Sequence, residues 1–205
     1  MRGGFKKAFF LFFTCPALIW FFLHPGDFLK EWVKVPQYFK NNLNRLLTGD
    51  ELAKVNEARW NAFGPAREEI TAKIFYNKGL VLVDDFFSAL ASLSPRLYFQ
   101  AGDGTQLSPP KVEPVAGPLF FFWVIGLIEF LKRRQFKILS LPFIFALGAY
   151  LLGQSNLAFL LPILVVYAFI SFKGLETIKN INWRRFSFFL VFLYGAFLLG
   201  RMFLL

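Results

Sequence analysis

Residues 186–205 read FSFFLVFLYGAFLLGRMFLL, an apolar run whose only charged side chain is Arg201. A helix needs about 20 mainly apolar residues to cross the hydrocarbon core of a bilayer, and this run has that length. Four further apolar runs are Phe5–Leu23, Pro118–Leu131, Ile138–Leu152 and Leu157–Phe172. Hydrophobic residues make up 56% of the chain, more than a soluble domain of 205 residues usually carries. The sequence therefore predicts an all-α, polytopic integral membrane protein with five transmembrane helices.

The net charge of +10 is unevenly distributed, and the distribution predicts a topology. Between His24 and Ala116, 11 basic residues balance 11 acidic ones. Eleven of the other 12 basic residues form three clusters at helix ends: Arg2, Lys6 and Lys7; Lys132, Arg133, Arg134 and Lys137; Lys173, Lys179, Arg184 and Arg185. Basic residues at such positions stay on the cytoplasmic side. We expect a multi-pass protein of the plasma (cytoplasmic) membrane with its N-terminus inside and its C-terminus outside. We expect no nucleic-acid partner, because the basic residues do not alternate with aromatic ones.

This topology divides the chain into three parts. Residues 1–23 are predicted to form a signal-anchor helix, residues 24–116 an extracytoplasmic helical segment, and residues 117–205 a four-helix transmembrane region. Apolar residues between Phe28 and Leu93 recur at helical spacing, which predicts amphipathic helices along the membrane surface. Thr48 and Glu51 have the spacing of a capping box, and Pro65 suits the first position of a further helix. Residues 101–118 are rich in Gly and Pro and should form a loop.

The sequence offers few groups for catalysis or metal binding. Cys15 and His24 are the only cysteine and histidine, so no Cys/His metal site and no cofactor are predicted. The weak catalytic candidates are Asp27, Asp84, Asp85 and Asp103. Asp84 and Asp85 are neighbours on a predicted helix, where side chains point about 100° apart, so they should not share one site. Arg201 lies four residues from the chain end, where its guanidinium can reach a lipid phosphate.

The segment 90–104, LASLSPRLYFQAGDG, carries a family resemblance. It resembles the S-x-x-S-P-x-x-L-F-x-x-G-D stretch of bacterial membrane glycosyltransferases of the dolichyl-phosphate-mannose-protein mannosyltransferase-like (GT-C) class. The matching positions are Ser94, Pro95, Gly102 and Asp103, which the resemblance places in an outer loop. The likeness covers roughly residues 75–205. It departs from the family after the first helix, where Asp27 stands without the neighbouring acid that those enzymes carry.

The resemblance implies the C-terminal part of such an enzyme, as a stand-alone descendant, a split subunit or a gene fragment. Our first expectation is a non-catalytic subunit or scaffold of the cell envelope, in contact with the lipid bilayer, a polyprenyl-phosphate lipid or another membrane subunit. The alternative is an active transferase that uses a polyprenyl-phosphate sugar. A transporter component is the least favoured hypothesis, because the inner helices lack charged or Gly-interrupted midplane residues.

Overall fold

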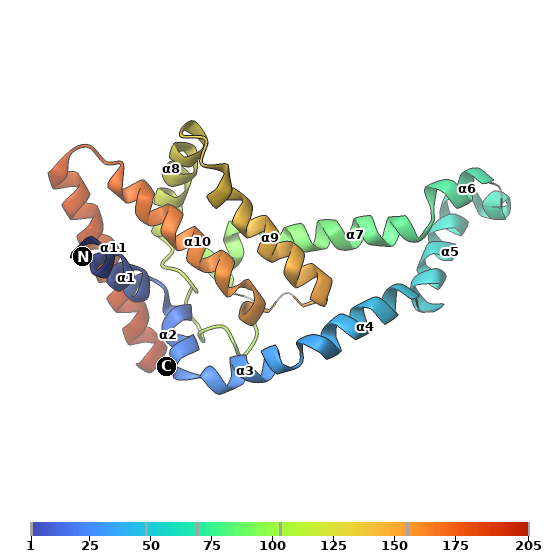
Figure 1. The fold of residues 1–205 in the computed structure, drawn as a ribbon, viewed down its shortest axis with the longest axis horizontal. Coiled ribbons are helices and arrows are strands. Elements are labelled where there is room, and N and C mark those ends of the chain that lie inside the picture. Colours follow the sequence, from blue (N-terminus) through green and yellow to red (C-terminus); the bar gives the residue numbers. More distant parts are fainter. Residues whose placement is uncertain (1, 48, 69, 103, 155, 205) are drawn as a thin grey trace.

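Every secondary-structure element in the described part of the chain is a helix. The computed structural model describes residues 2–47, 49–68, 70–102, 104–154 and 156–204. In chain order (Figure 1) the elements are α1 (Arg2–Thr14), α2 (Pro16–Leu23), α3 (Pro25–Val33), α4 (Val35–Leu47), α5 (Gly49–Phe63), the 3₁₀ helix η1 (Gly64–Glu68), α6 (Ile70–Phe75), α7 (Lys78–Ala91), the π-helix η2 (Leu97–Ala101), α8 (Leu119–Lys132), α9 (Phe136–Leu152), α10 (Leu157–Glu176) and α11 (Ile181–Leu204). The prediction of an all-α fold is confirmed for these residues.

Two of the described helices, α10 and α11, are long and apolar enough to cross a membrane. α10 is the central helix, and its side chains Leu160, Ile163 and Leu164 are completely buried. α11 is peripheral and leaves large apolar side chains such as Phe189 and Phe197 exposed along its length. An apolar helix with this exposure suits a hydrocarbon environment, whereas in water its exposed apolar side chains would be energetically unfavourable.

α8 and α9 form a sharply bent pair instead of two full-length spans. Their axes differ by 119° across the short break between Lys132 and Phe136. α8 has 14 residues and α9 has 17, and both fall short of the length of about 20 that a bilayer asks of a helix. The pair is a third candidate crossing, either as a broken span or as a re-entrant loop. Two or three crossings are therefore supported, and five spans stay a prediction.

The first apolar run, Phe5–Leu23, was predicted as one helix but is divided into α1 and α2 at Cys15. The cause is Pro16, which has no N–H for a helical hydrogen bond and starts α2. The backbone at this break bonds to the Gly/Pro-rich loop. Ala116 N–H donates to Thr14 O at 2.9 Å, and Ala17 N–H donates to Pro114 O at 3.1 Å. Because the loop provides these partners, the broken backbone is tolerated within an apolar environment.

α8 packs on α10 through two glycines, which allow the helix backbones to touch. A Cβ atom at Gly174 would clash with Phe122 O, and one at Gly126 would clash with Ile170 O. Small residues of this kind are enriched where membrane helices approach closely, because packing rather than water exclusion holds such helices together. The α8–α10 contact is therefore a close-packed interface that has no room for a larger side chain.

The turn between α9 and α10 is covered by α3 and α4. Gly153 ends α9 with a φ of 62°, and Asn42 Nδ2 donates to the last carbonyls of α9, Tyr150 O at 3.0 Å and Leu151 O at 3.1 Å. Trp32 Nε1 donates to Ala158 O at 3.1 Å at the start of α10. α3 and α4 are thereby fixed to the same end of the α9–α10 hairpin.

Helices α4 to α7 form an arm that extends from the bundle and returns along α9 (Figure 1). α5 ends at Phe63 because Gly64 adopts a φ of 53°, which interrupts a right-handed helix. Pro65 then lies in the 3₁₀ helix η1, not at the start of an α-helix as predicted. Thr48, the first residue of the predicted capping box, lies outside the described residues.

The basic loops lie together in the fold. The connection between α8 and α9 carries Lys132, Arg133 and Arg134, and the connection between α10 and α11 follows Lys173. Both connections lie in the upper part of Figure 1, whereas the C-terminus lies at the bottom. Two of the three basic clusters are thus found toward the same end of the bundle, whereas the N-terminus, where the third cluster begins, lies lower in this view.

Candidate functional site

The Gly/Pro-rich segment between η2 and α8 is an irregular loop that is attached on both sides. Trp20 Nε1 in α2 donates to Gln106 O at 3.0 Å, and Val115 N–H donates to Tyr98 O at 2.9 Å. Together with the bonds at the α1–α2 break, these contacts fix the two ends of the loop. The loop therefore forms a rigid rim at the end of the bundle where α11 finishes.

Gly102 sets the course of this loop. Its φ of 65° and ψ of −170° fall in a region that is open essentially to glycine alone. A Cβ atom here would also clash with Ser108 Oγ, because the chain folds back on itself between these two residues. Lys111, further along the loop, has a left-handed φ of 58° although it is not a glycine. Strained backbone of this kind concentrates at functional sites.

The segment that resembles the glycosyltransferase motif is fixed to the bundle by two tyrosines. Tyr98 OH donates to Ser92 O at 2.6 Å, and Tyr167 OH of α10 donates to Leu93 O at 2.6 Å. The two rings meet edge to face, with centroids 5.0 Å apart. Because both hydroxyls bond to backbone just before Ser94, the turn at Ser94 and Pro95 has a fixed position.

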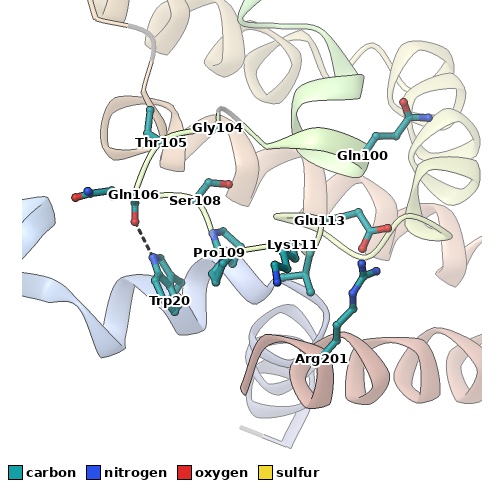
Figure 2. A pocket seen from close by; sticks show the side chains of 12 residues that line it. Trp20, Gln100, Gly104, Thr105, Gln106, Ser108, Pro109, Lys111, Glu113 and Arg201 are labelled. Atoms are coloured by element: carbon teal, nitrogen blue, oxygen red, sulfur yellow. Dashed lines mark hydrogen bonds between the residues drawn. The ribbon is translucent and has the colours of Figure 1, made fainter. Parts of the chain in front are cut away.

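A polar cavity of about 800 Å³ lies between the loop, α2 and the C-terminal end of α11. Figure 2 shows the residues around it, with Arg201 of α11 and Lys111 of the loop supplying two cations. Trp20, Gln100, Thr105 and Ser108 add an aromatic ring, an amide and two hydroxyls. A cavity with cations and neutral donors at the end of an apolar helix suits a ligand that carries an anionic group.

Glu113 is the carboxylate of this site, and one of its oxygens is left free. Tyr194 OH of α11 donates to Glu113 Oε1 at 3.0 Å. The other oxygen, Oε2, is buried and has no hydrogen-bond partner among the described residues. The Arg201 guanidinium points toward this carboxylate in Figure 2, but the two groups form no ion pair. A buried carboxylate oxygen without a partner is costly, and such a group calls for an explanation such as a bound ligand or water.

Glu113 also borders a second cavity of about 480 Å³. This cavity is lined by Ser94 and Pro95 of the glycosyltransferase-like segment, together with Arg96 and Tyr194. Glu113 and Gln100 line both cavities, so they form the wall that the two share. The fold thus brings the motif-like turn, the loop and the last helix to one place.

The predicted site residues fall into three groups. Ser94, Pro95 and Arg201 line the cavities, and Gly102 shapes the loop beside them. Asp27 is an exposed residue of α3 that pairs with Lys30 at 2.9 Å and lines neither cavity. The hydrogen bond and charge of Lys30 lower the pKa of Asp27, which makes it a weaker base.

The other acidic candidates stay untested by the geometry. Asp84 and Asp85 belong to α7 on the arm, and their side chains lie outside the described part of the structure. Asp103 is not among the described residues. Where the structure is described, no three carboxylate, histidine or cysteine side chains gather as ligands for a metal ion.

Sequence reasoning missed Glu113, Tyr194 and Lys111. Glu113 is the only acidic residue between Gly104 and Ile128, a signal that marks it within its loop. Tyr194 is a polar group inside an apolar run, and such groups often have a specific partner in membrane proteins. Glu113 and Tyr194 lie 81 positions apart in the sequence, so no local pattern reveals their contact.

Comparisons with known proteins find no matching family model, no similar curated protein and no similar solved structure. The resemblance to membrane glycosyltransferases therefore depends on the residues of segment 90–104 alone, and the arrangement around Glu113 and Arg201 is the independent guide to function.

Proposed function

We propose that this chain is a multi-pass plasma-membrane protein that binds a phosphate-bearing lipid at the cavity between Lys111, Glu113 and Arg201. In this role it serves as a non-catalytic subunit or scaffold beside a lipid-linked-sugar glycosyltransferase. The observation that carries the proposal is the position of Arg201. The C-terminal end of the apolar helix α11 carries this guanidinium into the cavity with Lys111, and a long cationic side chain at the end of a spanning helix can reach lipid head groups.

An apolar cavity supports a lipid as the ligand. It measures about 560 Å³, lies between α8, α9 and α10, and is lined by side chains such as Leu127, Leu139 and Phe143. Its wall residue Trp123 stacks on Phe120, which lines the second cavity, with ring centroids 5.9 Å apart. The apolar cavity and the second cavity thus lie next to each other across this ring pair, which puts space for a hydrocarbon chain near the site.

Arg201→Gln should remove the preference for a phosphate group. We expect the wild-type protein in non-ionic detergent to bind undecaprenyl phosphate at least about tenfold more tightly than undecaprenol. The reason is that a hydrogen bond between charged partners is worth roughly 1.5–3 kcal/mol. Native mass spectrometry with both lipids measures the ratio. Arg185→Gln is the matched control, because Arg185 lies at the other end of α11. Equal affinity of the wild-type protein for the two lipids would contradict the proposal.

The proposed topology has its N-terminus inside, its C-terminus outside and five spans, and it is supported by the basic loops at one end of the bundle. In a Cys15→Ser background, a cysteine at Lys111 should react with an impermeant maleimide from outside intact cells. A cysteine at Gln135, in the α8–α9 connection, should react only after the cells are opened. Labelling of the cysteine at Gln135 from outside intact cells would show that the proposed topology is wrong.

A second candidate function is an active transferase that uses a polyprenyl-phosphate sugar. Glu113 favours it, because its carboxylate borders both cavities and its Oε2 has no hydrogen-bond partner among the described residues, as a general base for an acceptor hydroxyl requires. We nevertheless expect the purified chain to transfer no sugar, since Glu113 is the only acidic side chain among the described residues that line the two cavities. A transfer assay with a panel of polyprenyl-phosphate sugars is the measurement. Turnover that is lost in Glu113→Gln or Asp103→Asn, but kept in Glu129→Gln, would establish the enzyme.

A further inference from the structure

We infer that Glu113 recognises a hydroxyl group on the head group of the bound lipid, and so selects phosphodiester lipids whose head group carries a hydroxyl. The inference rests on the proposed binding of a lipid phosphate at Arg201 and names what lies beyond that phosphate. It assigns to Glu113 a role in specificity that is separate from the attraction between the cations and the phosphate.

The hydrogen-bonding capacity of the site defines the ligand. Arg201 and Lys111 only donate hydrogen bonds, so the group between them must accept, as phosphate oxygens do. An ionised carboxylate only accepts, so the group that meets Glu113 must donate. The phosphate of a phosphodiester lipid carries no proton near neutral pH, so it accepts hydrogen bonds and donates none. The complementary ligand therefore carries a phosphate and, next to it, a hydroxyl.

Because Oε2 of Glu113 is buried, a hydrogen bond from this hydroxyl should produce a measurable difference in affinity between lipids with and without it. Tyr194 OH occupies Oε1 and holds the carboxylate in place, while Oε2 is buried without a partner among the described side chains and backbone groups. Oε2 has almost no accessible surface, so a ligand hydroxyl must displace the side chains that cover it. Once in contact, the hydroxyl forms a hydrogen bond to a charged acceptor that is shielded from solvent. Such bonds are stronger than those between neutral groups, and a ligand without the hydroxyl leaves the oxygen unsatisfied.

The space around Glu113 matches this assignment. Glu113 and Gln100 stand between the cavity of about 800 Å³ that contains Arg201 and the cavity of about 480 Å³ that contains Ser94 and Arg96. A phosphate held at Arg201 thus leaves room for a polyol to extend past Glu113. The amide of Gln100 and the hydroxyl of Ser94 offer further partners for its other hydroxyls.

The test compares two lipids with equal charge, dioctanoyl phosphatidylglycerol and dioctanoyl phosphatidylmethanol. Both are phosphodiesters, and only the first has head-group hydroxyls. We expect the wild-type protein in non-ionic detergent to bind phosphatidylglycerol about tenfold more tightly. Glu113→Gln should bring the two affinities within about twofold, because only phosphatidylglycerol loses a hydrogen bond. A circular-dichroism spectrum and an unfolding midpoint close to those of the wild-type protein would show that this variant is folded.

The controls separate this inference from the proposed function. Glu129→Gln, at the far end of α8 where Glu129 pairs with Arg133 at 2.6 Å, should keep the preference for phosphatidylglycerol. Arg201→Gln should weaken the binding of both lipids by a similar factor.

If Glu113→Gln keeps the tenfold preference for phosphatidylglycerol, the hydroxyl assignment is wrong while the proposed phosphate binding stands. If Arg201→Gln changes neither affinity, the proposed function fails. If Glu113→Gln proves unfolded, Glu113→Asp replaces it, and a preference that survives the shortened side chain at full strength overturns the inference.

Discussion

Gly174→Val should prevent α8 and α10 from packing and should be the most destabilising single substitution in the bundle. A Cβ at Gly174 would collide with Phe122 O and would come within 2.8 Å of Gly126 N, so the obstacle is backbone that no rotamer change can move. Overpacking a core costs typically 1–3 kcal/mol, occasionally more, and here the neighbours cannot yield locally. We expect a large fall in the unfolding midpoint in detergent, with aggregation on size-exclusion chromatography.

Two glycines provide matched controls for this substitution. Gly148 in α9 and Gly200 in α11 are also helical glycines, and a Cβ at either would meet nothing within 4 Å. Valine has a higher helix propensity than glycine, so Gly148→Val and Gly200→Val should be neutral or slightly stabilising. Gly126→Val should behave like Gly174→Val, because its Cβ would collide with Ile170 O. A midpoint for Gly174→Val equal to that of Gly148→Val would mean that α8 and α10 do not approach as described.

The helices could be predicted from sequence because their signals are local. Long apolar runs predict α10 and α11, and the helical spacing of apolar residues predicts the helices of the arm. The loop over residues 102–118 follows from its Gly and Pro content. The bend between α8 and α9 was harder to predict, because two apolar helices of 14 and 17 residues fit either two short spans or one broken pair.

The break in the first apolar run depends on a distant part of the chain. Pro16 warns of a kink, but a proline in a membrane helix is often tolerated, as Pro142 in α9 and Pro162 in α10 show. The structure differs at Pro16 because Pro114 and Ala116 bond to the exposed backbone. These residues lie about a hundred positions away, so the sequence gives no local reason to choose a break over a kink.

The candidate site was the least predictable feature, since its chemistry is assembled from three segments. The sequence directed attention to Asp27, Asp84, Asp85 and Asp103, each judged by its neighbours in the chain. Glu113 stands out because Tyr194 OH donates to its Oε1 and because its Oε2 is buried. Both features depend on the tertiary structure and cannot be predicted from neighbouring residues. Arg201 was identifiable because a charge in an apolar helix near its end stands out by itself.

Gly102→Ala should strongly weaken lipid-phosphate binding, although Gly102 makes no contact with the ligand in the proposed mode. Its backbone conformation costs a non-glycine residue roughly 1–3 kcal/mol. The added Cβ would also strike Ser108 Oγ, and even with that hydroxyl rotated away it would lie 3.4 Å from Ser108 Cβ and 3.5 Å from Pro114 Cγ. The loop must then shift, and it carries Lys111, Glu113 and the residues that bond to the α1–α2 break. We expect undecaprenyl phosphate affinity to fall at least about tenfold, with a lower unfolding midpoint.

A double-mutant cycle separates the clash from the backbone strain. Gly104→Ala adds a Cβ at a φ of 70° in open space, so it is a control for a positive φ without the clash. Adding Ser108→Ala to Gly102→Ala removes the hydroxyl and leaves Ser108 Cβ, 3.4 Å away, as the nearest contact. The double variant should therefore recover to about the level of Gly104→Ala, whereas Ser108→Ala alone should change little. Independent, additive effects of the two substitutions would show that the loop does not fold back at Ser108. The presence of glycine at position 102 would then have to be explained by something other than its close approach to Ser108.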